Sequence, residues 1–217
     1  EQAKRSEDVA PGVEPRPEGI DTTHYSVIDA DGNVALVNYT INFSFGSGVA
    51  VPGAGFVLNN EMDDFVAKPG VANAFGLMGG EANAVAAGKR PLSSMSPIMV
   101  FKDGDLRLAS GSPGGSVIIT SVLQLIVNVI DHDMNLAEAT LAPRMHHQWY
   151  PDRIIIESGF SPDTVRLLEA KGHTVMQTPN KMGSLQTVGY RDGTFLGASD
   201  TRRPNAAAIA PGNSQTQ

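Results

Sequence analysis

Cysteine is absent from all 217 residues of this chain, and other features are scarce as well. Without cysteine there is no disulfide framework, no thiol nucleophile and no thiolate metal site. Acidic residues outnumber basic ones, giving a net charge of −7, and this argues against nucleic-acid binding, which needs a basic patch. No apolar run approaches the ~18 residues of a transmembrane helix. The first residue is not Met, so we expect a piece of a longer product.

Glycine, by contrast, is frequent, with 23 residues, and the chain divides into two unequal parts. Residues 1–21 are rich in Pro, Glu and Gly and lack hydrophobic periodicity, which is typical of a solvated linker. Residues 22–217 are long enough to form one domain with a core of its own. We expect this domain to open with strands at 22–29 and 34–43, joined by a hairpin loop at 30–32.

The rest of the chain alternates between predicted strands and predicted helices. The segment 116–130 is apolar almost all round, which predicts a buried helix. Ser161 followed by Pro162 predicts the start of another helix, because serine caps well and proline suits the first helical position. Further expected elements are strands at 55–58, 95–101, 106–110 and 153–157, a short helix at 135–142, three short strands around 191–193, a long loop at 66–92 and a frayed tail after 203. Hairpins interleaved with buried helices predict a layered α+β fold.

Thr22 opens the first predicted strand, and the hairpin loop decides which residue lies opposite it. A three-residue loop with Gly32 in the left-handed conformation places Thr22 opposite Thr40, whereas a two-residue loop places it opposite Ile41. In the first register Thr40 could hydrogen-bond the Thr22 hydroxyl, because directly opposed Cβ atoms lie about 5 Å apart. Asn42 then shares a strand face with Thr40. From spacing alone, threonines chosen for β-propensity in a half-exposed strand are the commoner explanation.

Gly114 and Gly115 stand directly before the apolar helix. Consecutive backbone N–H groups at a helix N-terminus form a ready site for an anion or an oxyanion. No Gly-Lys-Ser/Thr sequence follows, so the segment is not a P-loop. A turn that needs positive φ is the ordinary explanation for such a pair.

Two other segments carry polar groups suited to a small charged ligand. Glu61, Asp63 and Asp64 place three carboxylates close together, which could hold an ammonium group or a hard cation, although the spacing is not that of a calcium loop. Ser93 and Ser94 are adjacent hydroxyls that could hold a carboxylate. A solvated acidic turn and ordinary turn serines are the alternatives.

His146 and His147 are adjacent, and adjacent side chains point in different directions on any regular element. They therefore make a poor chelate, and the surrounding sequence looks like amphipathic packing. We expect neither a metal ion nor another cofactor. A Gly-x-Ser-x-Gly nucleophile elbow is also missing from the sequence.

These signals are weak one by one, but their order along the chain is specific. It closely resembles the small, catalytic subunit of the γ-glutamyltranspeptidases, from Thr22 to about Arg203. The segments that carry the resemblance are TTHYSVID, NYTINFSFGSG, LNNEMDDF, KPGVANAFGLMGG, GKRPLSSMSPIMV, SGSPGGSVIITSVLQ, APRMHHQWYPD, GFSPDTVRLLEAKGH and GASDTRR. That family belongs to the N-terminal-nucleophile hydrolases, so the resemblance implies the catalytic half of a four-layer αββα sandwich. Residues 1–21 would then be the tail of the large subunit.

The resemblance also implies catalytic roles for particular residues. Thr22 matches the nucleophile, and the Asp21–Thr22 bond matches the site of autoproteolysis that makes it a new N-terminus. Thr40 matches the residue that hydrogen-bonds this nucleophile. Gly114 and Gly115 match the oxyanion hole.

Substrate-binding roles follow from the resemblance in the same way. Asn42, Glu61 and Asp64 match positions that hold the α-amino group of a γ-glutamyl substrate. Ser93 and Ser94 match the site of its α-carboxylate. A γ-glutamyl group carries an ammonium and a carboxylate on one carbon, so carboxylates suit the first and hydroxyls the second.

The implied enzyme is a γ-glutamyltransferase and glutathione hydrolase. A threonine hydroxyl is a poor nucleophile and needs a base. The freed α-amino group of Thr22, with a reference pKa of about 7.7–8.0, could serve as that base. Attack on glutathione or another γ-glutamyl compound would give a γ-glutamyl-enzyme ester, resolved by water or by an amino acid or peptide acceptor. The expected partner is the large subunit of the same precursor, and the implied location is periplasmic or secreted.

The sequence departs from the family pattern at two points, and two alternatives stay open, the second because the chain runs unbroken through Asp21–Thr22. Phe75 replaces a Tyr found in the lid loop of some members, and the large subunit's Arg, which pairs with the substrate carboxylate, lies outside this sequence. One alternative is a cephalosporin acylase of the same superfamily, whose glutaryl substrate lacks the α-amino group. The other is an uncleaved, non-catalytic module. Glu61 and Asp64 favour a γ-glutamyltransferase over the acylase, because only the γ-glutamyl substrate carries an ammonium group.

Overall fold

The computed structural model describes residues 22–210 of the chain. The predicted linker at 1–21 and the Asp21 side of the expected cleavage site lie outside these residues. The fold mixes helices with three separate sheets, so the predicted α+β class is confirmed.

The first sheet is the predicted hairpin of β1 (Thr22–Ile28) and β2 (Val34–Thr40). The second sheet is antiparallel, in the order β3-β4-β8-β9. Its strands are β3 (Ile98–Lys102), β4 (Asp105–Ser110), β8 (Gln186–Arg191) and β9 (Thr194–Ser199). Its hairpins turn at 102–105, between the strands predicted at 95–101 and 106–110, and at 191–194, where three short strands are predicted around 191–193.

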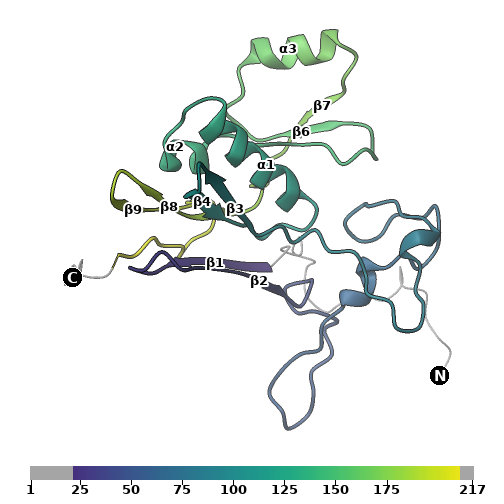
Figure 1. Ribbon diagram of the computed structural model, residues 1–217. Helices are drawn as coiled ribbons and strands as arrows, with labels where there is room; N and C mark the ends of the chain where they lie inside the picture. Colours follow the sequence, from purple (N-terminus) through teal and green to yellow (C-terminus); the bar gives the residue numbers. More distant parts are fainter. Residues whose placement is uncertain (1–21, 211–217) are drawn as a thin grey trace, which may run out of the picture.

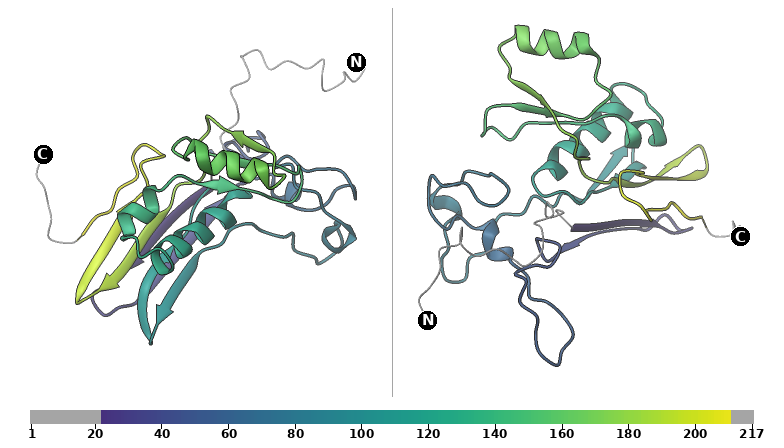
Figure 2. Two further views of the ribbon diagram at one scale, coloured as in Figure 1. Left: turned by 90° about the horizontal axis from the view of Figure 1, so that it is seen from above. Right: turned by 180° about the vertical axis from the view of Figure 1, so that it is seen from behind.

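Helices α1 (Val117–Ile130) and α2 (Leu136–Leu141) cover one face of the second sheet, and β1 and β2 lie against the other (Figures 1 and 2). The core lies between the helices and this sheet. Its buried members are Leu108, Ile118, Val122, Leu125, Ala139 and Leu185. Residues 22–210 therefore supply three layers of the expected four-layer sandwich, and no helix among them covers the outer face of β1 and β2.

The prediction that the apolar helix is buried is wrong for one of its sides. Ile118, Val122 and Leu125 of α1 are buried, but Ile119 and Leu123 are more than half exposed, at 53% and 55%. One side of α1 packs on the sheet and the segment at 145–146 contacts another part of the helix, which leaves Ile119 and Leu123 exposed. None of the helices in residues 22–210 has both the length and the hydrophobicity to cross a bilayer.

A smaller unit stands beyond α1 (Figure 1). It contains a mixed sheet of β5 (Met145–His146), β6 (Ile154–Ile156) and β7 (Val175–Gln177), together with α3 (Pro162–Ala170). The Ser161 side chain caps α3 by accepting a hydrogen bond from the Asp163 N–H, and Pro162 occupies its first turn, as predicted.

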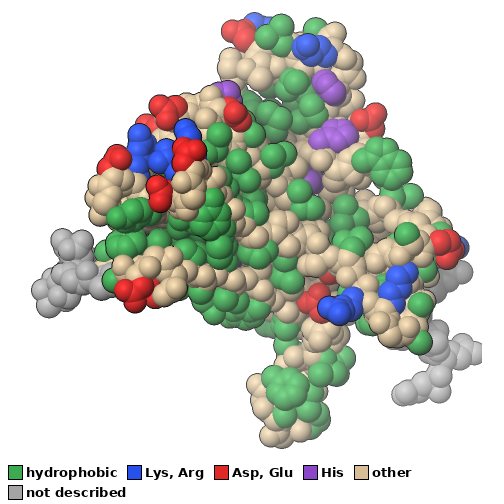
Figure 3. Space-filling model, viewed as in Figure 1, with side chains coloured by type: hydrophobic (Ala, Val, Ile, Leu, Met, Phe, Trp, Pro, Cys, Tyr) green, Lys and Arg blue, Asp and Glu red, His purple; other side chains and the backbone are tan. Residues whose placement is uncertain are grey.

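Between β2 and β3 the chain is mostly irregular. The strand predicted at 55–58 is wrong, because Val57 forms only a single bridge with Ala50 instead of a ladder. Short 3-10 helices occupy Glu61–Asp64 and Glu81–Asn83, the second within the predicted long loop. The part of the chain between 44 and 58 projects away from the body and carries exposed aromatic side chains, including Phe45 and Phe56 (Figures 1 and 3).

Candidate active site

Thr22 is the first residue of β1, and its side chain is buried. Its hydroxyl donates a hydrogen bond of 3.1 Å to Oγ1 of Thr40, which lies directly opposite in the hairpin. The hairpin uses the three-residue loop, with Gly32 at a φ of 83° and a closing pair between Asp29 and Asn33. Of the two registers that the sequence leaves open, this is the one that pairs the two threonines.

Asn42 contacts the Thr40 hydroxyl from a position just after the end of β2. Its backbone N–H donates to Oγ1 of Thr40 over 2.8 Å, so Thr40 accepts from both sides. The expected strand to residue 43 is wrong at this point, because β2 ends at Thr40 and Asn42 has a φ of 76°. Left-handed backbone breaks a β-ladder, and asparagine tolerates it better than most residues. Asn42 therefore meets Thr40 through a turn and not through a shared strand face.

Asn60 attaches the acidic 3-10 helix to the end of β2. Its backbone N–H donates to the Ile41 carbonyl, and its side-chain oxygen accepts from the Phe43 N–H. The Asn42 side chain in turn donates to the Asn60 carbonyl over 3.2 Å. The helix Glu61–Asp64 starts at the next residue, so Asn60 ties the start of this acidic helix to the chain that follows Thr40.

Glu61 and Asp64 form an acidic pair whose charge is not compensated within residues 22–210. Burial raises the pKa of Glu61, and the negative charge of Asp64 raises it further. Burial also raises the pKa of Asp64, with the charge of Asp63 adding to the shift. Oε1 of Glu61 is buried and has no hydrogen-bond partner among the described residues. A cation bound here would relieve both the repulsion and the desolvation.

Gly114 and Gly115 both adopt positive φ, at 136° and 56°, immediately before α1. A Cβ on Gly114 would lie 2.7 Å from the Val117 side chain and 3.2 Å from the Gly183 backbone, so the site has no room for a larger residue. Within residues 22–210, neither glycine N–H donates a hydrogen bond. Free N–H groups at a helix start can stabilise developing negative charge.

Ser93 and Ser94 are not joined to Thr22 by any hydrogen bond within the described residues. The Ser93 hydroxyl accepts from the Met95 N–H, and the Ser94 carbonyl accepts from the Ser96 hydroxyl. Their expected role at a substrate carboxylate therefore stays a prediction.

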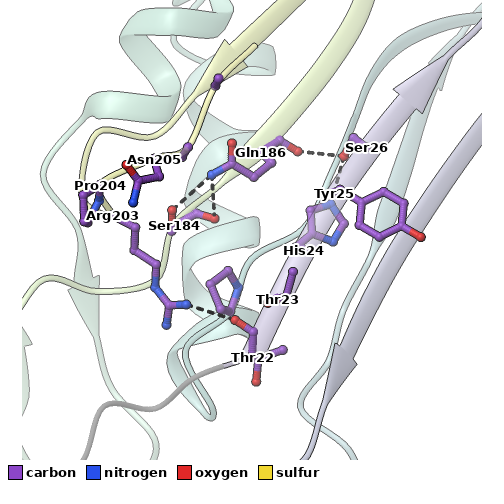
Figure 4. A pocket seen from close by; sticks show the side chains of 13 residues that line it. Thr22, Thr23, His24, Tyr25, Ser26, Ser184, Gln186, Arg203, Pro204 and Asn205 are labelled. Carbon is purple, nitrogen blue, oxygen red and sulfur yellow. Dashed lines mark hydrogen bonds between the residues drawn. The ribbon is translucent and has the colours of Figure 1, made fainter. Parts of the chain in front are cut away.

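Arg203 is a site residue that sequence reasoning missed. Its guanidinium donates a 3.0 Å hydrogen bond to the backbone carbonyl of Thr22, across 181 positions of sequence (Figure 4). Both residues line a cavity of about 380 Å³, together with Pro113 and the chain that follows Arg203. No local pattern links two residues so far apart, so only the fold could reveal this contact.

His24 is a second residue that was missed, although its position gave a signal. It lies two residues after Thr22 on the same face of β1 and is buried. Its ring bonds the side chains of Asn38 and Ser26, and Asn38 donates onward to the Ser112 carbonyl over 2.9 Å. Burial lowers the pKa of His24. This chain of contacts connects β1 to the segment that leads into Gly114.

His146 and His147 point into different surroundings. The two ring nitrogens of His146 bond Thr120 and Gln148, each over 2.8 Å, whereas His147 bonds the exposed Asp152. Burial lowers the pKa of His146. Both ring nitrogens of His146 are thus engaged with protein groups.

Known proteins resemble this chain along nearly its whole length. The family model described as gamma-glutamyltranspeptidase matches residues 1–210. A glutathione hydrolase proenzyme of Escherichia coli (strain K12) is 56% identical over 202 residues, which cover 93% of this chain and 35% of the relative. The chain thus spans about a third of the length of the curated relatives it matches.

Solved structures agree with the sequence comparison. An acivicin-inhibited gamma-glutamyltranspeptidase superposes with a TM-score of 0.81 at 50% identity, covering 84% of this chain and all of that chain. In that protein the C-terminus has critical roles in autoprocessing and catalysis. A gamma-glutamyltranspeptidase from Pseudomonas nitroreducens gives a TM-score of 0.81 at 45% identity, covering 87% of this chain and 100% of the other. The chain belongs to the gamma-glutamyltranspeptidase family.

Proposed function

We propose that this chain is the catalytic part of a γ-glutamyltransferase that also hydrolyses glutathione and that matures by cleavage of the Asp21–Thr22 bond. The observation that carries the proposal is the contact between the buried Thr22 hydroxyl and Thr40, together with an uncompensated acidic pair in the helix that Asn60 ties to the chain after Thr40. A nucleophile and an ammonium site at one strand end suit an acyl donor that carries an α-amino group.

Cleavage gives Thr22 its general base. In the uncleaved chain its nitrogen is a peptide amide, which cannot accept a proton at neutral pH. The freed amine, with a reference pKa of about 7.7–8.0, takes the hydroxyl proton as Oγ1 attacks the γ-carbonyl carbon. The Gly114 and Gly115 N–H groups stabilise the resulting oxyanion. The base then returns the proton to the leaving amine, and an ester to Thr22 remains.

Water or an acceptor amine resolves this ester. The incoming nucleophile gives its proton to the Thr22 amine, adds to the ester carbonyl and displaces Oγ1, which regains a proton. Water yields free glutamate, and an amino acid or peptide yields a new γ-glutamyl amide. Within the donor, the ammonium group pairs with Glu61 and Asp64, Asn42 adds a polar contact, and Ser93 and Ser94 take the carboxylate.

The proposed partner is the large subunit formed by the upstream part of the same precursor. Tyr25, Val27 and Tyr39 lie on the outer face of β1 and β2 and are all about half exposed. Residues 22–210 provide no layer for this face, and the upstream part would supply it together with a cation for the substrate carboxylate. The resemblance also implies a periplasmic or secreted location, which we retain as part of the proposal.

Substitution of Thr22 tests the proposal, because one hydroxyl serves both maturation and turnover. In the full-length precursor, Thr22→Ala should leave a single uncut chain by intact mass and no detectable release from a γ-glutamyl anilide. Thr23→Ala is the matched control, since Thr23 is exposed on the opposite face of β1, and it should cleave and turn over normally. A Thr22→Ala protein that still separates into two chains would place the scissile bond elsewhere.

A further inference from the structure

Gln148 connects three segments that are distant in sequence. Its side-chain oxygen accepts hydrogen bonds of 2.8 Å from the Ser116 hydroxyl and from the His146 ring. Its amide nitrogen donates to the carbonyls of Phe75 and Tyr150, each over 3.2 Å. All four hydrogen-bonding positions of one side chain are therefore occupied by protein groups.

The orientation of this amide is determined by its partners. Two backbone carbonyls can only accept, so the NH₂ group must face Phe75 and Tyr150. The oxygen then faces Ser116 and His146, and Nε2 of His146 must carry a proton to donate to it. A flipped amide would place its oxygen against two carbonyl oxygens. The donor character of the NH₂ group is thus essential to the contact with Phe75.

Phe75 lies in a compact turn at 73–77. The Asn73 side chain accepts from the N–H groups of Phe75 and Leu77 over 3.0 Å each, and the Asn73 N–H donates to the Leu77 carbonyl. Gly76 has a φ of 71°, which closes the turn. Because these bonds are internal, the turn is a unit that contacts outside it can hold or release.

Four outside contacts hold the turn, and they lead to three parts of the proposed site. One of them is the Asn73 side chain, which donates to the Asp63 carbonyl over 3.3 Å. The Phe75 ring packs on Phe43, one residue after Asn42, with centroids 5.5 Å apart. The Ala74 N–H donates over 3.3 Å to Asp63, within the acidic 3-10 helix. Gln148 ties the Phe75 carbonyl to Ser116, one residue after Gly115. In Figure 1 this part of the chain lies to the right of β1 and β2.

We propose that Gln148 is a positioning residue that latches the turn at 73–77 to the start of α1, where Gly114 and Gly115 stand. The latch couples closure of the donor-binding side of the site to the oxyanion side. This proposal rests on the proposed function for the identity of the site. The contacts of Gln148 themselves do not depend on which reaction the site catalyses. Loosening the latch leaves Thr22 and the glycines in place and weakens retention of the donor.

Hydrogen exchange of the turn amides in the full-length protein measures the latch directly. Gln148→Met removes the amide, and Gln148→Glu turns a carboxylate oxygen toward the two carbonyls. Both should speed exchange of the amides at 75–77 about fivefold or more, which corresponds to about 1 kcal/mol, the usual net contribution of one neutral hydrogen bond. The effect of Gln148→Glu should be the larger.

Gln124 offers a matched control. Its amide also donates to two backbone carbonyls, those of Thr120 and Met145, and accepts from the Met145 N–H. None of these groups belongs to the turn. Gln124→Met and Gln124→Glu should therefore leave exchange at 75–77 unchanged at equal global stability. Unchanged exchange in folded Gln148 variants would overturn the latch.

Two further measurements separate the latch from the proposed reaction and from misfolding. In active protein, Gln148→Met should raise the donor KM several-fold more than it lowers kcat, and the Gln124 variants should not. Exchange needs no turnover, so failure of the Thr22 test leaves it interpretable. If neither Gln148 variant folds, Ser116→Ala, which removes one donor to the Gln148 oxygen, should show a smaller increase in exchange, and no increase would overturn the proposal.

Discussion

Two groups of carboxylates in this chain meet opposite electrostatic conditions. One is the acidic pair, Glu61 and Asp64, in the 3-10 helix that Asn60 ties to the chain after Thr40. The other is a buried ion cluster that joins α2, β6 and the end of β9. Its members are Arg144, Glu157, Asp200 and Arg202.

The ion cluster is fully paired. Asp200 is completely buried and accepts from Arg144 over 2.6 Å, from Arg202 over 3.1 Å and from the Leu185 N–H. Glu157 accepts from Arg202 over 2.6 Å and from the backbone N–H groups of Arg144 and Met182. Every carboxylate oxygen in the cluster faces a donor.

The comparison between Glu157 and Glu61 shows that hydrogen-bonding and charged partners decide the direction of the pKa shift. Burial by itself would raise the pKa of Glu157, but the hydrogen bonds from Arg202 and the backbone outweigh it and the pKa is lowered. Glu61 has no cation among the described residues, and its pKa is raised. A buried carboxylate with cationic partners holds a fold together, whereas a partly buried acidic pair without a cationic partner favours a cationic ligand.

The largest expected effect comes from breaking the paired cluster. Asp200→Ala leaves Arg144 buried without its counter-charge, which typically costs about 3–5 kcal/mol. Chemical denaturation of the full-length protein measures this loss. Asp163→Ala is the control, because its ion pair with Arg166 on α3 is exposed and should contribute less than about 1 kcal/mol. Equal losses for the two variants would show that burial does not make the Asp200 ion pair more important to stability than the exposed Asp163 pair.

An intermediate effect is expected from the acidic pair, and it should appear in binding. Asp64→Ala deprives a substrate ammonium of a charge-assisted partner, which should reduce kcat/KM for a γ-glutamyl anilide by the equivalent of about 1.5–3 kcal/mol. A glutaryl anilide has no ammonium and should lose much less. Similar losses on both substrates would argue against the ammonium site and in favour of an acylase. Glu81→Ala, in the other 3-10 helix, should affect neither substrate.

The smallest expected effect is on the pH dependence of folding stability. The folded-state pKa of Glu61 is raised, so its contribution to stability is greatest below its ordinary value and is lost as pH rises through the raised value. Glu61→Gln should therefore stabilise the free protein at pH 7, by less than about 1 kcal/mol because the group is partly solvated. The gain should vanish below about pH 4. Thermal melts of both proteins at pH 7 and below about pH 4 check this prediction. A loss of stability at pH 7 in the Glu61→Gln variant would mean that a cation already binds at the acidic pair.

Much of the fold follows from local sequence patterns. Ser161 and Pro162 start α3, and the hairpin turns lie where glycine and acidic residues predict them. The one-sided burial of α1 could not be predicted, because apolar periodicity does not say how many layers are present. The end of β2 at Thr40 depends on the docking of Asn60, which is also a tertiary contact.

Local sequence determined the existence of the hairpin that begins at Thr22 and of the glycine turn before α1. It also placed three carboxylates between 61 and 64. Tertiary structure alone decided that Thr40 faces Thr22 in the realised register, that Arg203 reaches the Thr22 carbonyl, and that one acidic group is paired while the other is not. The physical reason is distance along the chain: propensity and capping act over a few residues, whereas charge pairing and burial depend on segments that only the fold brings together.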